Sequence, residues 1–385
     1  MHQGWRLEKL KDVAQIIGGS TPKTEVKEFW GGQHYWVTPA ELDGSKYISS
    51  TARTITDLAV QKSNLTLMPE GTVLLSSRAP IGKVAITTVP MFCNQGFKNI
   101  VCGRNLHNVY VYYFLKHNVD YLQSLGTGAT FKEISKRVVE NVCIPFPSLD
   151  EQRIIASELD LLSDIIEKKG LQLRDFDLIS DSLFYELIGD PVTNDRGWPI
   201  SQFGELCNSE LGKMLDSKRA SGEKKPYLCT INVLWDRIDL STQKEMLIEE
   251  DEFERYSVRK GDLLICEGGD IGRSAIWDRD DEMYYQNSLH RVRFDETKML
   301  PEVMLYIFKI LKDRGELDQY GKGQTIKHLV KKSLLSIPVP VPDIQVQRTF
   351  AEKLTAIKNN KALVQQSLVS TQLLFESRMN KYFND

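Results

Sequence analysis

The chain has 385 residues, of which 41% are hydrophobic and 26% are charged, and this length and composition fit two globular domains with connecting elements. No stretch approaches the roughly 20 consecutive apolar residues that cross a bilayer, and the first residues lack the apolar core of a signal peptide. We therefore expect a cytoplasmic protein. The net charge of −3 leaves nucleic-acid binding open, because phosphate contacts depend on local charge within a Debye length of about 8 Å.

The cysteines argue for a reducing compartment. They are scattered and form no CxxC pair, which is the spacing expected of many zinc sites and redox centres. In a chain of this size we expect reduced thiols and no disulfide framework. The six positions are Cys93, Cys102, Cys143, Cys207, Cys229 and Cys266.

In chain order, the pattern predicts a mixed α/β domain over residues 1–148, a long helix over 149–188, a second mixed α/β domain over 189–342 and a second long helix over 343–385. Short β-rich runs bounded by Gly and Pro turns predict strands. Apolar residues at helical spacing predict shorter helices within the domains. The expected strands are 72–76, 84–88, 262–266 and 291–294, and the expected helices are 108–121 and 301–312.

An internal repeat organises the chain. The segment 126–132 (Gly-Thr-Gly-Ala-Thr-Phe-Lys) matches 321–327 (Gly-Lys-Gly-Gln-Thr-Ile-Lys), and the Gly-Trp pair at Trp5 returns at Trp198. The offset stays at about 190–195 residues along the whole match, which is far longer than a solenoid repeat. Each repeat is therefore a full domain followed by a helix.

The two predicted long helices share an alternating 4-3 spacing of apolar residues, which is typical of a coiled-coil seam. Two unrelated core helices are the alternative, and the shared phase argues against it. The predicted seam of the first helix is Ile155, Leu159, Leu162, Ile166, Leu173, Phe176 and Leu183. The predicted seam of the second helix is Phe350, Leu354, Ile357, Val364, Leu368 and Phe375.

Connectivity predicts the direction of these helices. The first ends where the second domain begins, and the second starts where that domain ends. If their seams bury each other, the helices run antiparallel and the C-terminus returns to the first domain, giving a circular arrangement with a pseudo-two-fold axis. Roughly 38 residues at 1.5 Å each make a spacer of about 57 Å.

Arg, Lys and amide side chains gather at turns that match between the repeats. Arg and amide groups suit paired contacts with guanine and adenine edges, and lysines beside glycine loops suit phosphates. A solvated turn or a structural hydrogen bond is the alternative for each residue taken alone. The candidates in the first repeat are Arg78, Lys83, Asn94, Gln95, Thr130 and Lys132. Those in the second are Arg273, Gln286, Asn287, His290, Lys322, Gln324 and Lys327.

Catalytic signatures are missing from the sequence. The Gly-rich segments at 126–132 and 321–327 lack the spacing of a phosphate-binding GxxxxGK(S/T) loop. No GxSxG elbow and no Asn-Pro-Pro-Tyr tetrapeptide of an amino-methyltransferase occurs, and the histidines form no metal-ligand pair. We therefore expect no catalytic residue, no metal and no cofactor in this chain.

Over nearly its whole length the chain resembles the specificity subunit of type I restriction–modification systems. The resemblance rests on the doubled plan, the Gly-Trp openings, the segment 126–135 and the segment 144–153 (Ile-Pro-Phe-Pro-Ser-Leu-Asp-Glu-Gln-Arg) that enters the first long helix. The second repeat departs from the pattern at Gln324 and at 343–347 (Asp-Ile-Gln-Val-Gln), where a Leu-x-Glu-Gln pattern is more usual.

This resemblance implies a DNA-binding subunit that reads a bipartite, asymmetric sequence in double-stranded DNA, one half with each domain. It also implies that the helices set the spacing and dock two methyltransferase subunits, which methylate adenine at N6, and that restriction/translocase subunits join them. S-adenosylmethionine, ATP and Mg are then expected in those partners. Two alternatives stay open: a coiled-coil scaffold presenting two protein-binding domains in another defence assembly, and a methyltransferase or nuclease with an unfamiliar motif.

Overall fold

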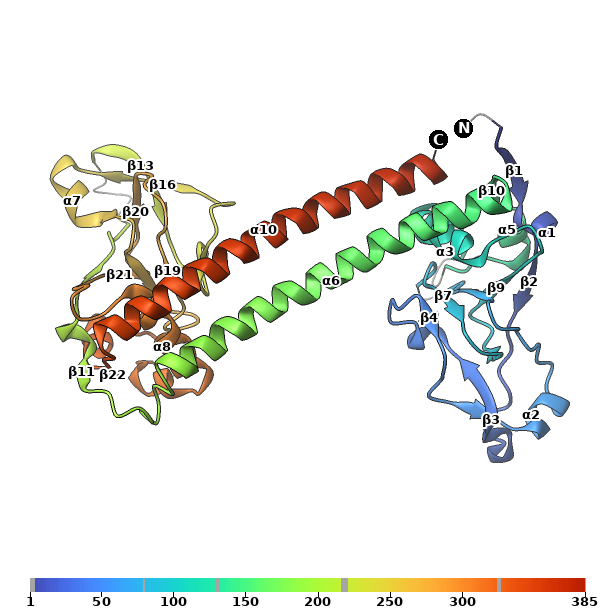
Figure 1. Cartoon of the computed structure of the whole chain (residues 1–385), viewed down its shortest axis with the longest axis horizontal. Helices are drawn as coiled ribbons and strands as arrows, with labels where there is room; N and C mark the ends of the chain where they lie inside the picture. Colours follow the sequence, from blue (N-terminus) through green and yellow to red (C-terminus); the bar gives the residue numbers. More distant parts are fainter. Residues whose placement is uncertain (1–3, 79, 129–131, 216–220, 324–326, 385) are drawn as a thin grey trace. The chain divides into compact units, whose positions relative to one another are not determined.

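The computed structural model describes residues 4–78, 80–128, 132–215, 221–323 and 327–384. The chain divides into two compact units, and each is described by itself. Unit 1 comprises Met1–Leu171 and Gln365–Asp385, and unit 2 comprises Gln172–Val364. Each unit contains one mixed α/β domain together with part of each long helix (Figure 1).

Unit 1 is built on a five-stranded sheet with the order β2-β9-β6-β7-β4, a three-stranded sheet β5-β3-β8 and the pair β1-β10. Strand β3 runs parallel to β8, and β4 runs parallel to β7, while the other pairs are antiparallel. The strands are β1 (Arg6–Lys9), β2 (Ala14–Gly18), β3 (Trp30–Val37), β4 (Tyr47–Ile48), β5 (Thr54–Ile55), β6 (Val73–Leu75), β7 (Val84–Thr87), β8 (Phe92–Cys93), β9 (Lys98–Cys102) and β10 (Cys143–Phe146). The helices are α1 (Leu10–Val13), α2 (Asp57–Lys62), α3 (Asn108–His117), α4 (Val119–Ser124), α5 (Lys136–Glu140) and the first part of α6 (Leu149–Leu187).

Unit 2 repeats this plan. Its sheets have the orders β12-β21-β18-β19 and β16-β13-β20-β17, and the pair β11-β22 stands where unit 1 has β1-β10. Its strands are β11 (Ile200–Gln202), β12 (Cys207–Leu211), β13 (Glu223–Leu228), β14 (Val233–Leu234), β15 (Arg237–Ile238), β16 (Lys244–Ile248), β17 (Ser257–Val258), β18 (Leu263–Cys266), β19 (Ser274–Ile276), β20 (Met283–Tyr285), β21 (Leu289–Phe294) and β22 (Pro338–Pro340). Its helices are α7 (Phe253–Tyr256), α8 (Pro301–Asp313), α9 (Lys331–Leu335) and α10 (Ile344–Phe383), which continues into unit 1.

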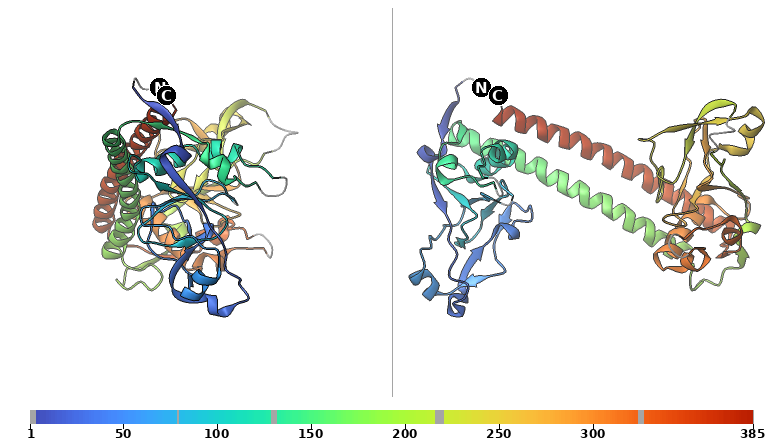
Figure 2. Two further views of the ribbon diagram at one scale, coloured as in Figure 1. Left: turned by 90° about the vertical axis from the view of Figure 1, so that its right-hand side faces the viewer. Right: turned by 180° about the vertical axis from the view of Figure 1, so that it is seen from behind.

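The two long helices run antiparallel, as contacts inside each unit show. In unit 1, Glu158 of α6 binds Tyr382 and Arg378, and Lys169 further along α6 donates to Ser367 and Thr371. The partners in α10 therefore have lower residue numbers as the residue numbers in α6 increase. Figures 1 and 2 show this part of α6 beside α10 from opposite sides.

The same direction holds in unit 2. Asp177 of α6 pairs with Lys361, and Phe184 packs against Phe350 with ring centroids 5.4 Å apart. The fold-class prediction of two tandem α/β domains joined to two long antiparallel helices is confirmed.

Burial along these helices follows the predicted seam. Every seam position in both helices is buried or half-buried. Positions on the outer face are more than half exposed: Ile154 at 67%, Leu161 at 62% and Leu178 at 64%. A 4-3 spacing places seam residues on one stripe of a helix, and that stripe is the one removed from solvent here.

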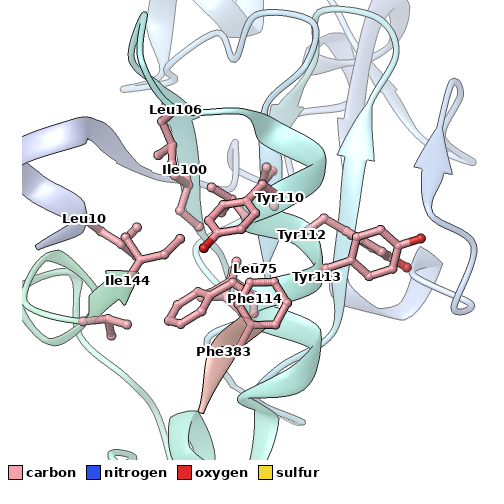
Figure 3. Packing of buried hydrophobic residues seen from close by; sticks show 14 of the residues in the cluster. Leu10, Leu75, Ile100, Leu106, Tyr110, Tyr112, Tyr113, Phe114, Ile144 and Phe383 are labelled. Carbon is pink, nitrogen blue, oxygen red and sulfur yellow. The ribbon is translucent and has the colours of Figure 1, made fainter. Parts of the chain in front are cut away.

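The end of α10 closes the core of unit 1. Phe383 is 6% exposed and packs against Tyr110 and Phe114 of α3, at ring-centroid distances of 5.3 and 5.8 Å. Figure 3 shows its ring among these aromatic side chains and Leu75. Aromatic side chains supply large buried areas, so the C-terminal helix is part of the first domain's core.

Candidate nucleic-acid interface

Three loops of unit 1 are joined by backbone hydrogen bonds into one surface. They lie between β6 and β7 (76–83), between β8 and β9 (94–97) and within 126–134. Ser77 N–H donates to Gly96 O at 2.7 Å, and Ile134 N–H donates to Ser77 O at 3.0 Å. Thr127 and Glu133 exchange two further backbone bonds. We call the described residues of these loops, together with the next one, the loop cluster of unit 1.

The fourth loop, residues 18–23, needs a glycine to join the cluster. A Cβ on Gly19 would lie 2.0 Å from the backbone oxygen of Asn94, a separation that no side chain permits. Ser20 N–H donates to Cys93 O, and the hydroxyl of Thr21 donates to Oε1 of Gln95 at 2.5 Å. The close approach therefore places Thr21 beside a predicted base-reading amide.

Unit 2 has an equivalent loop cluster, formed by the described residues of 211–215, 266–273, 286–288 and 321–329. Glu267 N–H donates to Ser288 O at 3.0 Å, and Leu329 N–H donates to Glu267 O at 2.6 Å. A Cβ on Gly212 would lie 2.3 Å from the backbone oxygen of Gln286. Each of these relations repeats one in unit 1, so the duplication produced two copies of one loop scaffold.

Five of the six candidates in the first repeat lie in the loop cluster of unit 1: Arg78, Lys83, Asn94, Gln95 and Lys132. Gln95 and Lys132 are exposed, and Asn94 is half-buried with Oδ1 accepting from Gly96 N–H. Arg78 is half-buried, and a Cβ on Gly96 would lie 3.4 Å from its Nε. Thr130 lies outside the described residues.

Lys83 and Arg273, which match between the repeats, both bind backbone carbonyls, and this structural role explains why both positions are basic. The ammonium of Lys83 donates to Leu42 O at 2.8 Å and to Pro39 O at 3.1 Å. Nη2 of Arg273 donates to Thr230 O at 2.8 Å. Both cations bind backbone carbonyls in the segments that follow the equivalent strands β3 and β13. Each cation therefore stabilises the position of that segment within its own domain.

Candidates of the second repeat divide in the same way. Gln286 and Asn287 are half-buried in the loop cluster, where Oε1 of Gln286 accepts from the hydroxyl of Ser288 at 3.2 Å. Lys322 and Lys327 are exposed, and Lys327 Nζ donates to Asp318 O at 3.2 Å. Gln324 lies outside the described residues.

His290 lies in the core of unit 2. It is 0% exposed, and its ring Nε2 donates to Leu329 O at 2.8 Å. Burial lowers its pKa. A side chain in this position presents no group to a ligand at the surface, so we do not retain His290 among the proposed contacts.

The side chains on the two scaffolds differ. Where unit 1 has Ser77 and Arg78, unit 2 has Glu267 and Gly268, and the ring of His328 lies over that glycine, 3.0 Å from where a Cβ would stand. Burial raises the pKa of Glu267. The sequence alignment of the repeats places Glu267 opposite Ser77, so this difference was open to sequence reasoning, which did not single it out.

The described residues contain no group of three or more His, Cys, Asp or Glu side chains placed to hold a metal ion. Burial raises the pKa of Cys93, Cys102 and Cys207 to about 12, so these thiols are neutral at physiological pH. Within the described chain, no helix is both long enough and apolar enough to span a bilayer.

Comparison with known proteins gives the family. Residues 2–173 and 195–370 each match the model of the type I restriction modification DNA specificity domain. The chain belongs to this family.

Its relatives include two specificity subunits of Methanocaldococcus jannaschii. The MjaIX subunit is 37% identical over 227 residues, which are 54% of this chain and 52% of that subunit. The MjaVIII subunit is 22% identical over 378 residues, covering 93% of this chain and 87% of the relative. The match to the first of these specificity subunits thus spans about half of its length.

Two solved specificity subunits share the fold. The S subunit from M. genitalium aligns over 99% of this chain and 96% of its own, with a TM-score of 0.58 and 17% identity. The HsdS subunit from Thermoanaerobacter tengcongensis aligns over 100% and 97%, with a TM-score of 0.52 and 18% identity. The two-domain plan with long helices is therefore the plan of known family members.

Proposed function

We propose that this chain is the DNA-recognition subunit of a type I restriction–modification complex, in which each α/β domain reads one half of a bipartite, asymmetric sequence. The observation that carries the proposal is the duplicated loop cluster. One scaffold is built twice, with the same backbone hydrogen bonds but different side chains at the exposed positions. Two readers with different specificity need this combination, because base edges are read by side chains while the scaffold sets their position.

The two clusters offer different chemistry to DNA. In unit 1, the Arg78 guanidinium and the Gln95 amide suit guanine and adenine edges in the major groove. In unit 2, Gln286 and Asn287 share the loop cluster with His328 and with Glu267, which is half-buried. Lys132, Lys322 and Lys327 supply positive charge for phosphates. An asymmetric target follows from these differences.

We assign DNA recognition to residues 1–148 and 189–342, and spacing and docking to the helices of 149–188 and 343–385. The outer faces of these helices carry exposed leucines: Leu161 at 62% and Leu373 at 61% within unit 1, and Leu178 at 64% and Leu363 at 63% within unit 2. Exposed large apolar side chains on a helix favour a protein partner. Two methyltransferase subunits would occupy these faces, and restriction/translocase subunits would join them.

Catalysis belongs to the partners in this proposal. The methyltransferase subunits would carry S-adenosylmethionine and methylate adenine at N6, and ATP and Mg would serve the restriction subunits. A complex that methylates cellular DNA and cleaves phage DNA acts in the cytoplasm, and we propose this location for the chain.

The test is a methylation assay with the purified chain and its methyltransferase partner. We expect transfer of labelled methyl groups from S-adenosylmethionine to genomic DNA only when both proteins are present. We also expect preferential binding of the assembly to one defined duplex over random DNA. Methylation by the chain alone would support the enzyme alternative, and an assembly that prefers no duplex would support the protein-binding scaffold.

A further inference from the structure

A guanidinium stacked on tryptophan stands at the surface of unit 1. Cζ of Arg53 lies 3.6 Å from the ring centre of Trp30 and 5.3 Å from that of Trp36. The two indoles pack edge to face, with ring centroids 5.0 Å apart and an interplanar angle of 83°. Arg53 itself is exposed. The stack therefore holds the guanidinium of Arg53 in one direction, whereas most surface arginines have mobile side chains.

Among the described residues, no acidic partner explains this arrangement of Arg53. Its side chain makes no hydrogen bond or ion pair with any residue that the structure describes. Asp57, four residues further along the chain, already accepts from His34 and Gln33, at 2.7 and 2.5 Å. The N–H edges of the Arg53 guanidinium are left for a ligand from outside the chain.

The stack is joined to the loop cluster of unit 1. Indole N–H of Trp36 donates to Ser20 O at 3.1 Å, and indole N–H of Trp30 donates to Lys23 O at 3.4 Å. Both tryptophans thus hold the loop 18–23 whose Thr21 binds Gln95. A continuous series of contacts runs from Arg53 through this loop to the amide that faces the proposed target.

Unit 2 has no counterpart among its described residues. There Lys225 lies over Phe253, with Nζ 4.8 Å from the ring centre, but its ammonium is already paired with Glu223 and Glu282 at 3.1 Å each. The free stacked cation is therefore a property of the first domain, and its effect should fall on one half of the target.

Taking the proposed function as given, we propose that Arg53 binds a backbone phosphate of the first half-site, outside the bases that Arg78 and Gln95 face. Stacking restricts the rotamers of Arg53 before DNA arrives, which lowers the entropy lost on binding. A planar guanidinium held by its face offers its edge to two phosphate oxygens. Exposed Lys23 and Lys27 in the neighbouring segment add positive charge.

The test compares Arg53→Ala and Arg53→Lys with Arg104→Ala in the full chain assembled with its methyltransferase partner. Arg104 is a matched control because it is exposed and follows the last residue of β9 (Lys98–Cys102), whereas the first residue of β9 adjoins the loop 94–97 of the cluster. Affinity is measured by fluorescence anisotropy on a labelled duplex carrying the sequence that the wild-type complex methylates. Titrations at several salt concentrations give the dependence of affinity on salt.

We expect Arg53→Ala to weaken binding about tenfold and to reduce the salt slope by about one, as the loss of one phosphate contact does. Arg53→Lys keeps the charge but loses the stacked fork, so it should retain the slope and weaken binding about threefold. The methylated sequence should stay unchanged in all variants, and Arg104→Ala should match the wild type.

Wild-type affinity in Arg53→Lys together with an unchanged slope in Arg53→Ala would overturn the inference. A changed methylated sequence would also overturn it, because a base contact alters specificity and a phosphate contact does not. If the alanine variant does not assemble, the lysine variant decides by its affinity alone. A wild-type complex that prefers no duplex is a different result, which removes the proposed function and with it the ligand of Arg53.

Discussion

Gln152 and Gln347 occupy the same place in the two repeats, and each makes the same three hydrogen bonds from a side chain that is 0% exposed. Each carboxamide accepts a backbone N–H from the residue that precedes a short helix, α3 or α8, and donates to two backbone carbonyls. For Gln152 the partners are His107 N, Asn105 O and Pro147 O, at 2.8, 3.1 and 3.0 Å. For Gln347 they are Leu300 N, Lys298 O and Pro342 O, at 2.8, 2.9 and 2.8 Å.

Replacing either glutamine by leucine should therefore destabilise the unit that contains it. Gln152→Leu or Gln347→Leu leaves one N–H and two carbonyls without this partner, one of the carbonyls in a fully buried bond, and we expect a loss of about 2–5 kcal/mol in the free energy of unfolding. Urea denaturation measures this loss. Gln172→Leu, at an exposed position of α6, is the control and should change stability by less than about 0.5 kcal/mol. A loss below about 1 kcal/mol at both buried glutamines would contradict this role.

Lys83 and Arg78 should respond oppositely to the same substitution. Lys83→Met removes a cation that donates to two carbonyls, so we expect it to cost about 1–3 kcal/mol of stability and to leave the methylated sequence unchanged. Arg78→Met should leave stability within about 1 kcal/mol of the wild type and impair target binding. Denaturation and methylome sequencing of both variants check the pair. Altered sequence preference in Lys83→Met would return this residue to the interface.

His290 should make unit 2 sensitive to acid. Its Nδ1 is buried and has no hydrogen-bond partner among the described residues, and burial lowers its pKa from 6.5. The folded chain therefore binds this proton less readily than the unfolded chain. Its contribution to stability is complete above about pH 6.5 and is lost as the pH falls below that value.

Urea unfolding at pH 7.5 and pH 5.5 measures this effect. The wild type should lose more stability between these pH values than His290→Gln, whose side chain does not titrate. Exposed His328 provides the control, because His328→Gln should behave as the wild type does. An equal loss in the wild type and in His290→Gln would show that another group governs the response.

The long helices were predictable because their periodicity is global. A stripe repeated over 39 and 40 residues specifies one buried face regardless of the details of packing. The helix expected over 108–121 is instead two helices, α3 and α4. Asn118 separates them, with φ −96°, ψ 26° and a side-chain bond to Phe114 O, because an asparagine amide competes with the helical backbone hydrogen bonds.

The interface was predictable only as a set of turns. Matching positions between repeats identified the loops, but the matched cations Lys83 and Arg273 bind backbone carbonyls, and a match in sequence does not reveal that role. His290 shows another limit. Strand β21 pairs with β12 and β18, and its first four residues are all buried. The usual alternation of buried and exposed side chains is therefore absent there, and the sequence could not show that His290 is buried.

Methylome sequencing of cells that carry the methyltransferase partner with the wild-type chain, Arg78→Ala or Gln286→Ala tests the central claim most directly. With the wild-type chain we expect methylated adenines in one bipartite sequence. Arg78→Ala should relax one half of that sequence and Gln286→Ala the other, each at a cost of about 1–3 kcal/mol in discrimination. Both substitutions acting on the same half, or wild-type methylation without a bipartite sequence, would contradict the account of two domains that read separate half-sites.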